Sequence, residues 1–511
     1  MSGNDNSSNA SRRQYIKGIG AFTSLSFAGV GTASERIREK QTPQPYNKYG
    51  QQGTSVRSSV YLKHVSELRT LRKRLKAYES TGDGNHIFTA DLKRQLRSSS
   101  TGTIDITVST CGERSEIVSR GQYGRPLHGW QPREQEIERL KAFGDIEFIP
   151  EVISTKVGLS DVAIDDLEKI AALDFVLEIG FDPELQLPDS ANSNVSASGS
   201  TPSADDLKTA SHSDFESVNY TISTINQVGI IGTGYSGDTD WGKNWAKSIG
   251  DANVEWNGID TDKAKDFIGS DWKSGHSHGT DCADTVAYML KEKDPHSNFI
   301  VPLEVYNPDT GNANASAARQ AIEYALTNDI PVSSMSVETT NDVGYCTSTL
   351  CEELQSYASA GYAVACATGN DSMESEVCHP ATSYYTIGVG GYSGSCSGGY
   401  NRANESNYAT VLYDDTDSNY EYCSWCYDAL GTSGFQPNVY SCYNFKTDDG
   451  TAKSGTSFAA PVVAAGSSLH YAEHGSISYE RHLSKYNNMS DKVVCPSSAS
   501  KLGNVLHVPD L

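Results

Sequence analysis

The C-terminal half of the chain alternates short apolar runs with segments of helical periodicity. The apolar runs, which we expect to be strands, cover residues 228–231, 299–305, 332–337, 363–367 and 385–389. The helical segments cover about residues 280–291, 315–327 and 347–360. Near-continuous apolar strands separated by helices are typical of a mostly parallel sheet with helices on both faces. We therefore predict an α/β domain over residues 218–480, with its functional residues at the carboxyl ends of the strands.

A different pattern precedes this domain. Its expected elements are a strand at 103–110, a helix at 133–143, a strand pair within 146–157, a helix ending near 174 and a strand at 176–181. Ser160 or Asp161 would cap the second helix. This order is that of a small α+β ferredoxin-like domain, which we place at residues 101–187.

The remaining segments are polar. Residues 35–100 contain one basic helical segment, at 65–75, and suggest no role. Residues 188–217 are rich in Ser, Asn, Ala and Asp, which predicts a flexible linker. Within the α/β domain, residues 397–450 form a Tyr- and Cys-rich insertion, and residues 481–511 form a C-terminal extension.

The first 34 residues have the pattern of an export signal. Residues 11–17 are SRRQYIK, and residues 18–33 carry no charge. The segment resembles a twin-arginine signal, with Arg12 and Arg13 as the pair. It is shorter than the roughly 20 apolar residues of a membrane-spanning helix. We expect it to be removed on export, leaving an extracellular product without a membrane anchor. The alternative is a soluble basic terminus followed by a linker.

The overall charge argues against polyanionic partners. The chain has 41 Lys and Arg against 64 Asp and Glu, a formal net charge of −23, and no long basic run. Nucleic acid and anionic membrane surfaces both require positive charge, so neither is an expected partner.

The most informative stretch is GTSFAAP, residues 455–461, because it places Ser457 where a helix is expected to begin. The small residues that follow allow close helix packing. Amide N–H groups at a helix start are unpaired and can stabilise an oxyanion if the hydroxyl attacks a carbonyl carbon. The simpler interpretation of such a serine is a helix cap.

Three segments together resemble the subtilisin family of serine proteases. GTSFAAP is similar to the nucleophile segment, HGTDCADTVA at 278–287 to the histidine segment, and ACATGN at 365–370 to the strand end that carries the oxyanion asparagine. The resemblance covers about residues 220–475. It implies that Ser457 is the nucleophile, His278 the general base and Asn370 an oxyanion donor. It also implies that Ser336 helps to bind substrate, and that the preceding domain is a propeptide.

The triad acid is missing from this resemblance. The family's aspartate ends a strand in a pattern like VAVIDSG, but residues 228–234 are VGIIGTG, so Gly232 stands in its place. Asp238 and Asp240, in the next loop, are the substitutes that we favour. Asp281 and Asp284, close to His278 in sequence, are alternatives.

The resemblance implies an exported serine endopeptidase, made as a proenzyme, that hydrolyses peptide bonds through an acyl-enzyme. The alternative is a pseudoprotease that binds peptides or proteins without cutting them. A structural surface protein would not need the three motifs, and a lipase or esterase would carry its serine in GxSxG. Expected partners are protein or peptide substrates and the chain's own propeptide, and we expect a monomer. No cofactor is required and no metal site is predicted; acidic loops such as 414–417 suggest structural calcium but match no ligand spacing.

The eleven cysteines fit an exported protein, in which disulfides persist. Cys111 lies in the expected propeptide. The resemblance extends to the proteinase K branch at Cys282, which implies a buried free thiol, and Cys366 lies in an apolar strand. The other eight could form up to four disulfides of open connectivity: Cys346, Cys351, Cys378, Cys396, Cys423, Cys426, Cys442 and Cys495. For the Cys423–Cys426 pair we favour a disulfide over a metal site.

Overall fold

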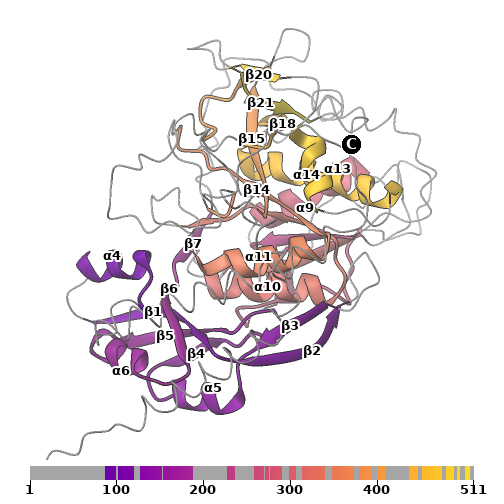
Figure 1. Cartoon of the computed structure of the whole chain (residues 1–511). Coiled ribbons are helices and arrows are strands. Elements are labelled where there is room, and N and C mark those ends of the chain that lie inside the picture. Colours follow the sequence, from indigo (N-terminus) through magenta and orange to yellow (C-terminus); the bar gives the residue numbers. More distant parts are fainter. Residues whose placement is uncertain are drawn as a thin grey trace, which may run out of the picture. The chain divides into compact units, whose positions relative to one another are not determined.

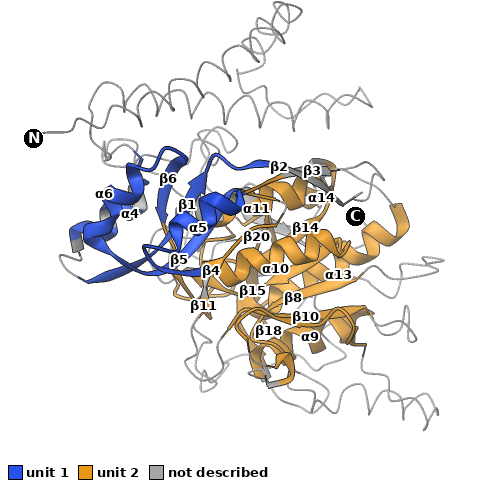
Figure 2. Ribbon diagram, turned by 90° about the horizontal axis from the view of Figure 1, so that it is seen from below, with its two compact units in different colours: residues 1–113, 132–146, 155–180 blue, residues 114–131, 147–154, 181–511 orange. Residues whose placement is uncertain are grey.

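The chain forms two compact units (Figure 1, Figure 2). Unit 1 comprises residues 1–113, 132–146 and 155–180, and unit 2 comprises residues 114–131, 147–154 and 181–511. The computed structural model describes residues 87–98, 102–119, 127–151, 153–187, 227–235, 258–269, 271–274, 277–290, 299–306, 313–339, 348–372, 379–381, 383, 385–393, 400–408, 437–446, 452–474, 479–487, 492–494 and 501–506. The expected export signal, the basic helical segment at 65–75 and the linker at 188–217 lie outside these residues. Within them, no helix has the length and apolar character needed to cross a membrane.

Unit 1 is built on a four-stranded sheet in the order β4-β5-β1-β6. Its elements are α4 (Ala90–Ser98), β1 (Thr103–Thr110), α5 (Glu134–Leu140), β4 (Asp145–Phe148), β5 (Lys156–Ala163), η2 (Ile164–Asp166), α6 (Leu167–Ala171) and β6 (Val176–Phe181). The predicted order of strands and helices is therefore present. Between β1 and α5 in the sequence, the chain also forms a two-stranded sheet of β2 (Glu113–Ser119) and β3 (Leu127–Gln131), which belongs to unit 2 except for Glu113.

The predicted start of the second helix at Ser160 or Asp161 is wrong, because β5 continues through both residues. β5 pairs antiparallel with β1, and the pairing includes an irregularity between Ile104 and Ile106. Asp161 adopts a φ of 54° in β5, and its backbone N–H donates to Asp105 Oδ1 at 3.0 Å. Its carboxylate accepts from Thr103 Oγ1 at 3.3 Å instead of capping a helix. Pairing across the sheet thus outweighs the local capping preference, and the helix begins only after Ala163.

Unit 2 contains a ten-stranded sheet in the order β16-β20-β21-β17-β15-β14-β12-β8-β10-β9. Its strands are β8 (Val228–Gly232), β9 (Lys265–Asp266), β10 (Ile300–Glu304), β12 (Val332–Met335), β14 (Ala363–Ala367), β15 (Ile387–Ser393), β16 (Tyr400–Arg402), β17 (Val439–Cys442), β20 (Lys492–Val494) and β21 (Lys501–Val505). All neighbouring pairs from β21 to β9 are parallel, as the apolar runs predicted.

Helices cover both faces of this sheet, which confirms the predicted architecture. α9 (Ser277–Leu290) and α13 (Thr456–His474) pack on one face with Val228 and Ile230. α10 (Ala315–Thr327) and α11 (Ser348–Ser359) pack on the other face with Ile231 (Figure 1). Successive residues of a strand point to opposite faces, so β8 must be apolar throughout to meet both layers.

The insertion at 397–450 and the C-terminal extension, which carry none of the three motifs, also contribute strands to the sheet. Between residues 397 and 450, β16 and β17 join it, while β18 (Asn444–Lys446) pairs with β19 (Ala452–Ser454). Near the C-terminus, α14 (Tyr479–Asn487) precedes β20 and β21, and β21 pairs parallel with β17.

A short segment of the expected propeptide region lies in unit 2 and forms a separate sheet. β7 (Glu184–Gln186) is the central strand between β11 (Ala313–Asn314) and β13 (Glu338–Thr339), and both pairings are antiparallel. Leu185 at its centre is fully buried. β13 begins two residues after Ser336, so β7 binds a strand that leads directly from a predicted site residue.

Candidate active site

The carboxyl end of β8 lies against the start of α9. Thr233, the residue after β8, accepts a hydrogen bond at Oγ1 from the backbone N–H of Gly279, at 2.7 Å. A Cβ at position 279 would lie 2.2 Å from the carbonyl oxygen of Gly234, so only glycine allows this approach. The contact satisfies one of the N–H groups left unpaired in the first turn of a helix. It also fixes His278, the neighbour of Gly279, near the end of β8.

Ser457 is the second residue of α13. The nature of Pro461 determines which groups the backbone carbonyl of Ser457 contacts. In a regular helix, the N–H of residue 461 would donate to the carbonyl oxygen of residue 457, but proline has no N–H. The Ser457 carbonyl oxygen instead accepts from Ser336 Oγ at 2.8 Å and from Cys282 Sγ at 3.4 Å. The start of α13 is thereby joined to α9 and to the residue that follows β12.

Asn370 follows β14. Hydrogen bonds to its side-chain oxygen hold it in place and leave its amide nitrogen available as a donor. Its Oδ1 accepts from the backbone N–H of Thr456 at 2.8 Å and from Thr456 Oγ1 at 3.0 Å. Thr456 Oγ1 also accepts from the N–H of Gly369 at 3.2 Å. Asn370 Nδ2 is buried and has no hydrogen-bond partner among the described residues. A rigid and unused amide donor is what oxyanion stabilisation requires.

His278 lies beside the nucleophile segment. Its ring centroid is 5.5 Å from that of Phe458, the residue after Ser457. The Ser457 hydroxyl is buried and has no hydrogen-bond partner within the described ranges. His278, Ser336, Asn370 and Ser457, which the motifs singled out, therefore converge on the first turn of α13.

The structure describes two of the four acids considered as replacements for the missing aspartate, Asp281 and Asp284. Asp238 and Asp240 lie outside the described residues. Asp281 forms an ion pair with Lys453 of β19, with 2.5 Å between Oδ2 and Nζ. Asp284 is buried further along α9.

A carboxyl group that no motif indicates lies at the end of β10. Glu304 stands directly opposite Gly232 in the parallel β8–β10 pair and is fully buried. Burial raises the pKa of Glu304 to about 8, and the charges of Asp266 and Asp271 act in the same direction. Strongly shifted carboxyl groups at this edge of a parallel sheet are typical of functional sites. The only signal of Glu304 in the sequence is a charged residue that ends an apolar strand.

Comparison with models of known protein families identifies the family of the chain. The model of the subtilase family, Peptidase_S8, matches residues 194–493, which is more than half of the chain. This chain belongs to the subtilase family. The members of this family are serine-type peptidases.

Solved structures of subtilases are similar at low sequence identity. Fervidolysin from Fervidobacterium pennivorans, a keratinolytic enzyme related to subtilisin, is 15% identical with a TM-score of 0.48, and the match covers 80% of this chain and 60% of that one. A cold-adapted subtilisin-like serine proteinase is 17% identical with a TM-score of 0.38, covering 57% of this chain and 91% of that one. The subtilase chain described here thus spans 60% of the length of fervidolysin. A search of proteins with curated functions gave no significant match.

The cysteines near the subtilase site are thiols. Cys282 and Cys366 are buried and free, as expected. Burial raises the pKa of Cys282 to about 12, so it remains a neutral hydrogen-bonding group and not a nucleophile. The expectation of a disulfide at Cys442 is wrong, because this buried residue is a thiol whose Sγ donates to the carbonyl oxygen of Asn444 at 3.1 Å. The other seven candidates lie outside the side chains that the structure describes.

Removing the Asn370 amide nitrogen is expected to lower kcat by about 10² to 10³ with little change in KM, because the donor acts mainly on the oxyanion. Asn370→Asp is the informative variant, since it retains the Oδ1 acceptor for Thr456 but loses the donor. Steady-state kinetics on a fluorogenic peptide would measure both constants. Wild-type kcat in Asn370→Asp would mean that Asn370 serves only to hold Thr456.

Proposed function

We propose that the protein is an exported serine endopeptidase, made as a proenzyme, that cleaves peptide bonds through an acyl-enzyme at Ser457. The observation that carries this proposal is the convergence of a buried serine hydroxyl, His278 and an uncommitted amide donor of Asn370 at the start of α13. These are the nucleophile, base and oxyanion donor that acyl transfer needs.

The proposed reaction uses only these side chains and no cofactor. Ser457 Oγ attacks the carbonyl carbon of the scissile bond while His278 takes the hydroxyl proton. Asn370 Nδ2 and the backbone N–H of Ser457 stabilise the oxyanion. His278 then donates the proton to the leaving amine, and water repeats the sequence to release the acyl group.

Binding of β7 supports an inhibited precursor. An extended segment that adds a strand between two sheet edges is a common way to bind a peptide. β11 and β13 would be the substrate-binding edges, and residues 184–186 occupy them within the same chain. A substrate would displace this segment after the chain is cut within residues 188–217. Ser336 contributes through its hydrogen bond to the Ser457 carbonyl, which fixes the approach of β13 to the nucleophile.

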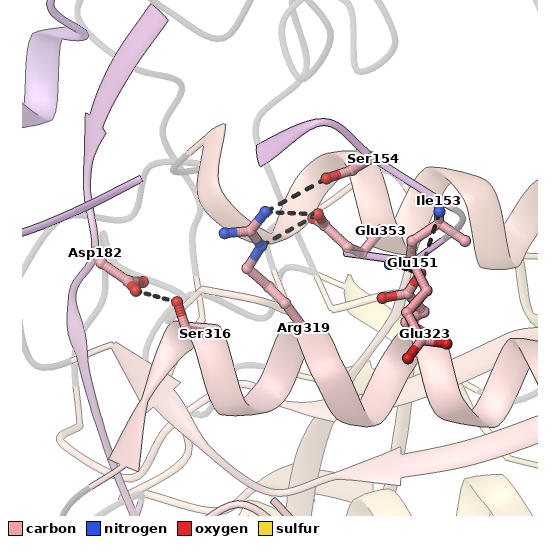
Figure 3. Close-up of polar contacts among 8 residues, drawn as sticks. All are labelled: Glu151, Ile153, Ser154, Asp182, Ser316, Arg319, Glu323 and Glu353. Carbon is pink, nitrogen blue, oxygen red and sulfur yellow. Dashed lines mark hydrogen bonds and ion pairs between the residues drawn. The ribbon is translucent and has the colours of Figure 1, made fainter. Parts of the chain in front are cut away.

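Contacts of residues 151–154 and 182 with α10 support the same proposal (Figure 3). Glu323 Oε1 of α10 accepts from the backbone N–H groups of Glu151 at 3.0 Å and Ile153 at 3.2 Å. Asp182 accepts a hydrogen bond from the hydroxyl of Ser316, at the start of α10. These polar contacts would hold residues 151–154, and residue 182 just before β7, against α10 before processing.

The pair Arg12 and Arg13 supports a further part of the proposal, export by the twin-arginine route, with the mature enzyme outside the cell. We also propose that the mature enzyme is a monomer. The second candidate is the peptide-binding pseudoprotease. The observation that favours it is Gly232, which cannot orient His278 at the position where the family carries aspartate.

Fluorophosphonate labelling of the purified, processed protein tests the proposal. We expect labelling of the wild type, because the probe reacts with activated serines, and no labelling of Ser457→Ala. Circular dichroism would verify that both proteins are folded. An unlabelled wild type that is folded and freed of residues 1–187 would contradict the proposal and favour the pseudoprotease.

A further inference from the structure

The residue opposite Gly232 in the neighbouring strand is a candidate for the carboxyl group that the site lacks. β8 and β10 pair in parallel with Glu304 opposite Gly232. Ile300 of β10 packs with α9 and α13, as do Val228 and Ile230 of β8, whereas Leu303 faces the other layer. Because side chains alternate along a strand, Glu304 and position 232 both face the helix that carries His278.

The surroundings of Glu304 leave its carboxyl group uncommitted. Neither of its oxygens has a hydrogen-bond partner among the residues that the structure describes. Burying a carboxyl group without a hydrogen-bond partner costs free energy of folding. The stability of the fold therefore does not explain why a glutamate is at this position. Burial raises the pKa of Glu304 most, and the charges of Asp266 of β9 and Asp271 before η3 (Trp272–Ser274) raise it further.

Two glycines bring Glu304 close to α9. A Cβ at Gly234, whose φ is 74°, would lie 2.8 Å from the Glu304 carboxyl carbon. The carbonyl oxygen of Gly234 in turn lies against Gly279, the neighbour of His278. The carboxyl group therefore lies one backbone segment away from the first turn of α9.

We propose that Glu304 supplies the carboxylate that positions His278, in place of the aspartate that Gly232 replaces; this rests on the proposed protease function. Neighbouring strands are about 4.8 Å apart, and glutamate is longer than aspartate by one methylene, about 1.5 Å, so a glutamate on β10 extends toward the space of an aspartate on β8. That space is open: a Cβ at Gly232 would meet no atom of the described chain within 4 Å. Glu304 is a positioning residue, because it acts by accepting the His278 ring N–H and by stabilising the imidazolium formed when Ser457 loses its proton.

The proposal predicts an alkaline activity profile. Only the ionised carboxylate carries the negative charge that stabilises the imidazolium, and Glu304 holds its own proton up to about pH 8. The rate of fluorophosphonate labelling should therefore rise as pH increases through about 8. A Glu304→Gln variant should lack this rise, because glutamine does not titrate.

The decisive experiment measures labelling rates of processed wild type, Ser457→Ala, Glu304→Gln and Glu304→Gln with Gly232→Asp. We expect Glu304→Gln to lower the rate by about 10⁴, the loss seen when a triad acid is neutralised. Adding Gly232→Asp should restore most of it, since aspartate at that position faces α9. Glu473→Gln, an exposed acid near the end of α13, is the charge-matched control and should leave the rate unchanged.

Each outcome has a distinct meaning. Equal labelling of wild type and Glu304→Gln, with none in Ser457→Ala, would overturn the role of Glu304 and leave the protease function standing. A loss in Glu304→Gln that Gly232→Asp does not restore would also overturn it, because the loss would then be structural. Absence of Ser457-dependent labelling in wild type would instead refute the protease function.

If Glu304→Gln fails to fold, Asp266→Asn provides the test. This change removes a negative charge that raises the Glu304 pKa, while its Oδ1 can still accept from the N–H of Ile268, now at 2.7 Å. The rise in labelling rate should then move to lower pH. An unmoved profile would overturn the proposal.

Discussion

A His278→Ala variant is expected to hydrolyse a fluorogenic peptide about 10⁶-fold more slowly than the processed wild type, because loss of the base alone removes nearly all triad catalysis. Without an acceptor for its proton, the Ser457 hydroxyl is a weak nucleophile at neutral pH. The residual rate would come from the oxyanion donors and from substrate binding. Burst titration with an active-site inhibitor would normalise the enzyme concentrations.

The control must separate chemistry from packing, because His278 is buried against Phe458. His278→Gln keeps most of the side-chain volume but cannot act as a base near neutral pH. Both variants should lose activity while His278→Gln unfolds near the wild-type temperature. Unchanged hydrolysis in either variant would mean that Ser457 is not activated by His278, as in a pseudoprotease.

Replacing Arg319 by methionine is expected to lower the free energy of unfolding by about 3 to 5 kcal/mol, because it leaves a buried carboxylate without its ion-pair partner. Arg319 Nε and Nη2 donate to Glu353 Oε1 at 3.1 and 3.0 Å, and both side chains are fully buried (Figure 3). The guanidinium also lies 4.7 Å from the ring centroid of Phe148 and donates to Ser154 Oγ. Urea unfolding in a Ser457→Ala background, which prevents self-cleavage, would measure the loss.

Two further variants make this prediction specific. In the double variant Arg319→Met with Glu353→Leu, no unpaired charge is buried, so most of the lost stability should return. Arg139→Met breaks an exposed pair, Arg139 with Asp174 at 2.8 Å, and should cost at most about 1 kcal/mol. Equal losses in Arg319→Met and Arg139→Met would contradict the assignment of a buried charge effect.

Periodicity and motifs in the sequence predicted much of unit 2. The predicted helix at 315–327 and strand at 363–367 agree with α10 and β14 at both ends. These elements are long or continuously apolar, so the local sequence pattern alone indicates which residues are buried and stabilise them. The motif residues His278, Asn370 and Ser457 were predicted from the resemblance of their segments to the subtilisin family.

Elements and contacts that depend on distant partners were not predicted. The helix expected from Ser160 is a continuation of β5, because pairing with β1 outweighs the capping preference of Asp161. Thr456 forms hydrogen bonds with Asn370 and Gly369, which are more than 80 positions away in the chain. The distance from Thr456 Oγ1 to Asn370 Oδ1 is 3.0 Å. The sequence could not distinguish Cys442 from the other seven disulfide candidates, because only packing shows where its thiol lies.

The sequence by itself determined the fold class, the order of the motif residues and the absence of aspartate at position 232, since all three are properties of local residue patterns. The tertiary structure alone decided which side chains share the start of α13, how β7 binds between β11 and β13, and which carboxyl group faces the position of the missing acid. Glu304 is 72 residues from Gly232 in the chain, and only the register of two parallel strands makes them neighbours. Strand register depends on the packing of both faces of the sheet against four helices, and no local pattern contains that information.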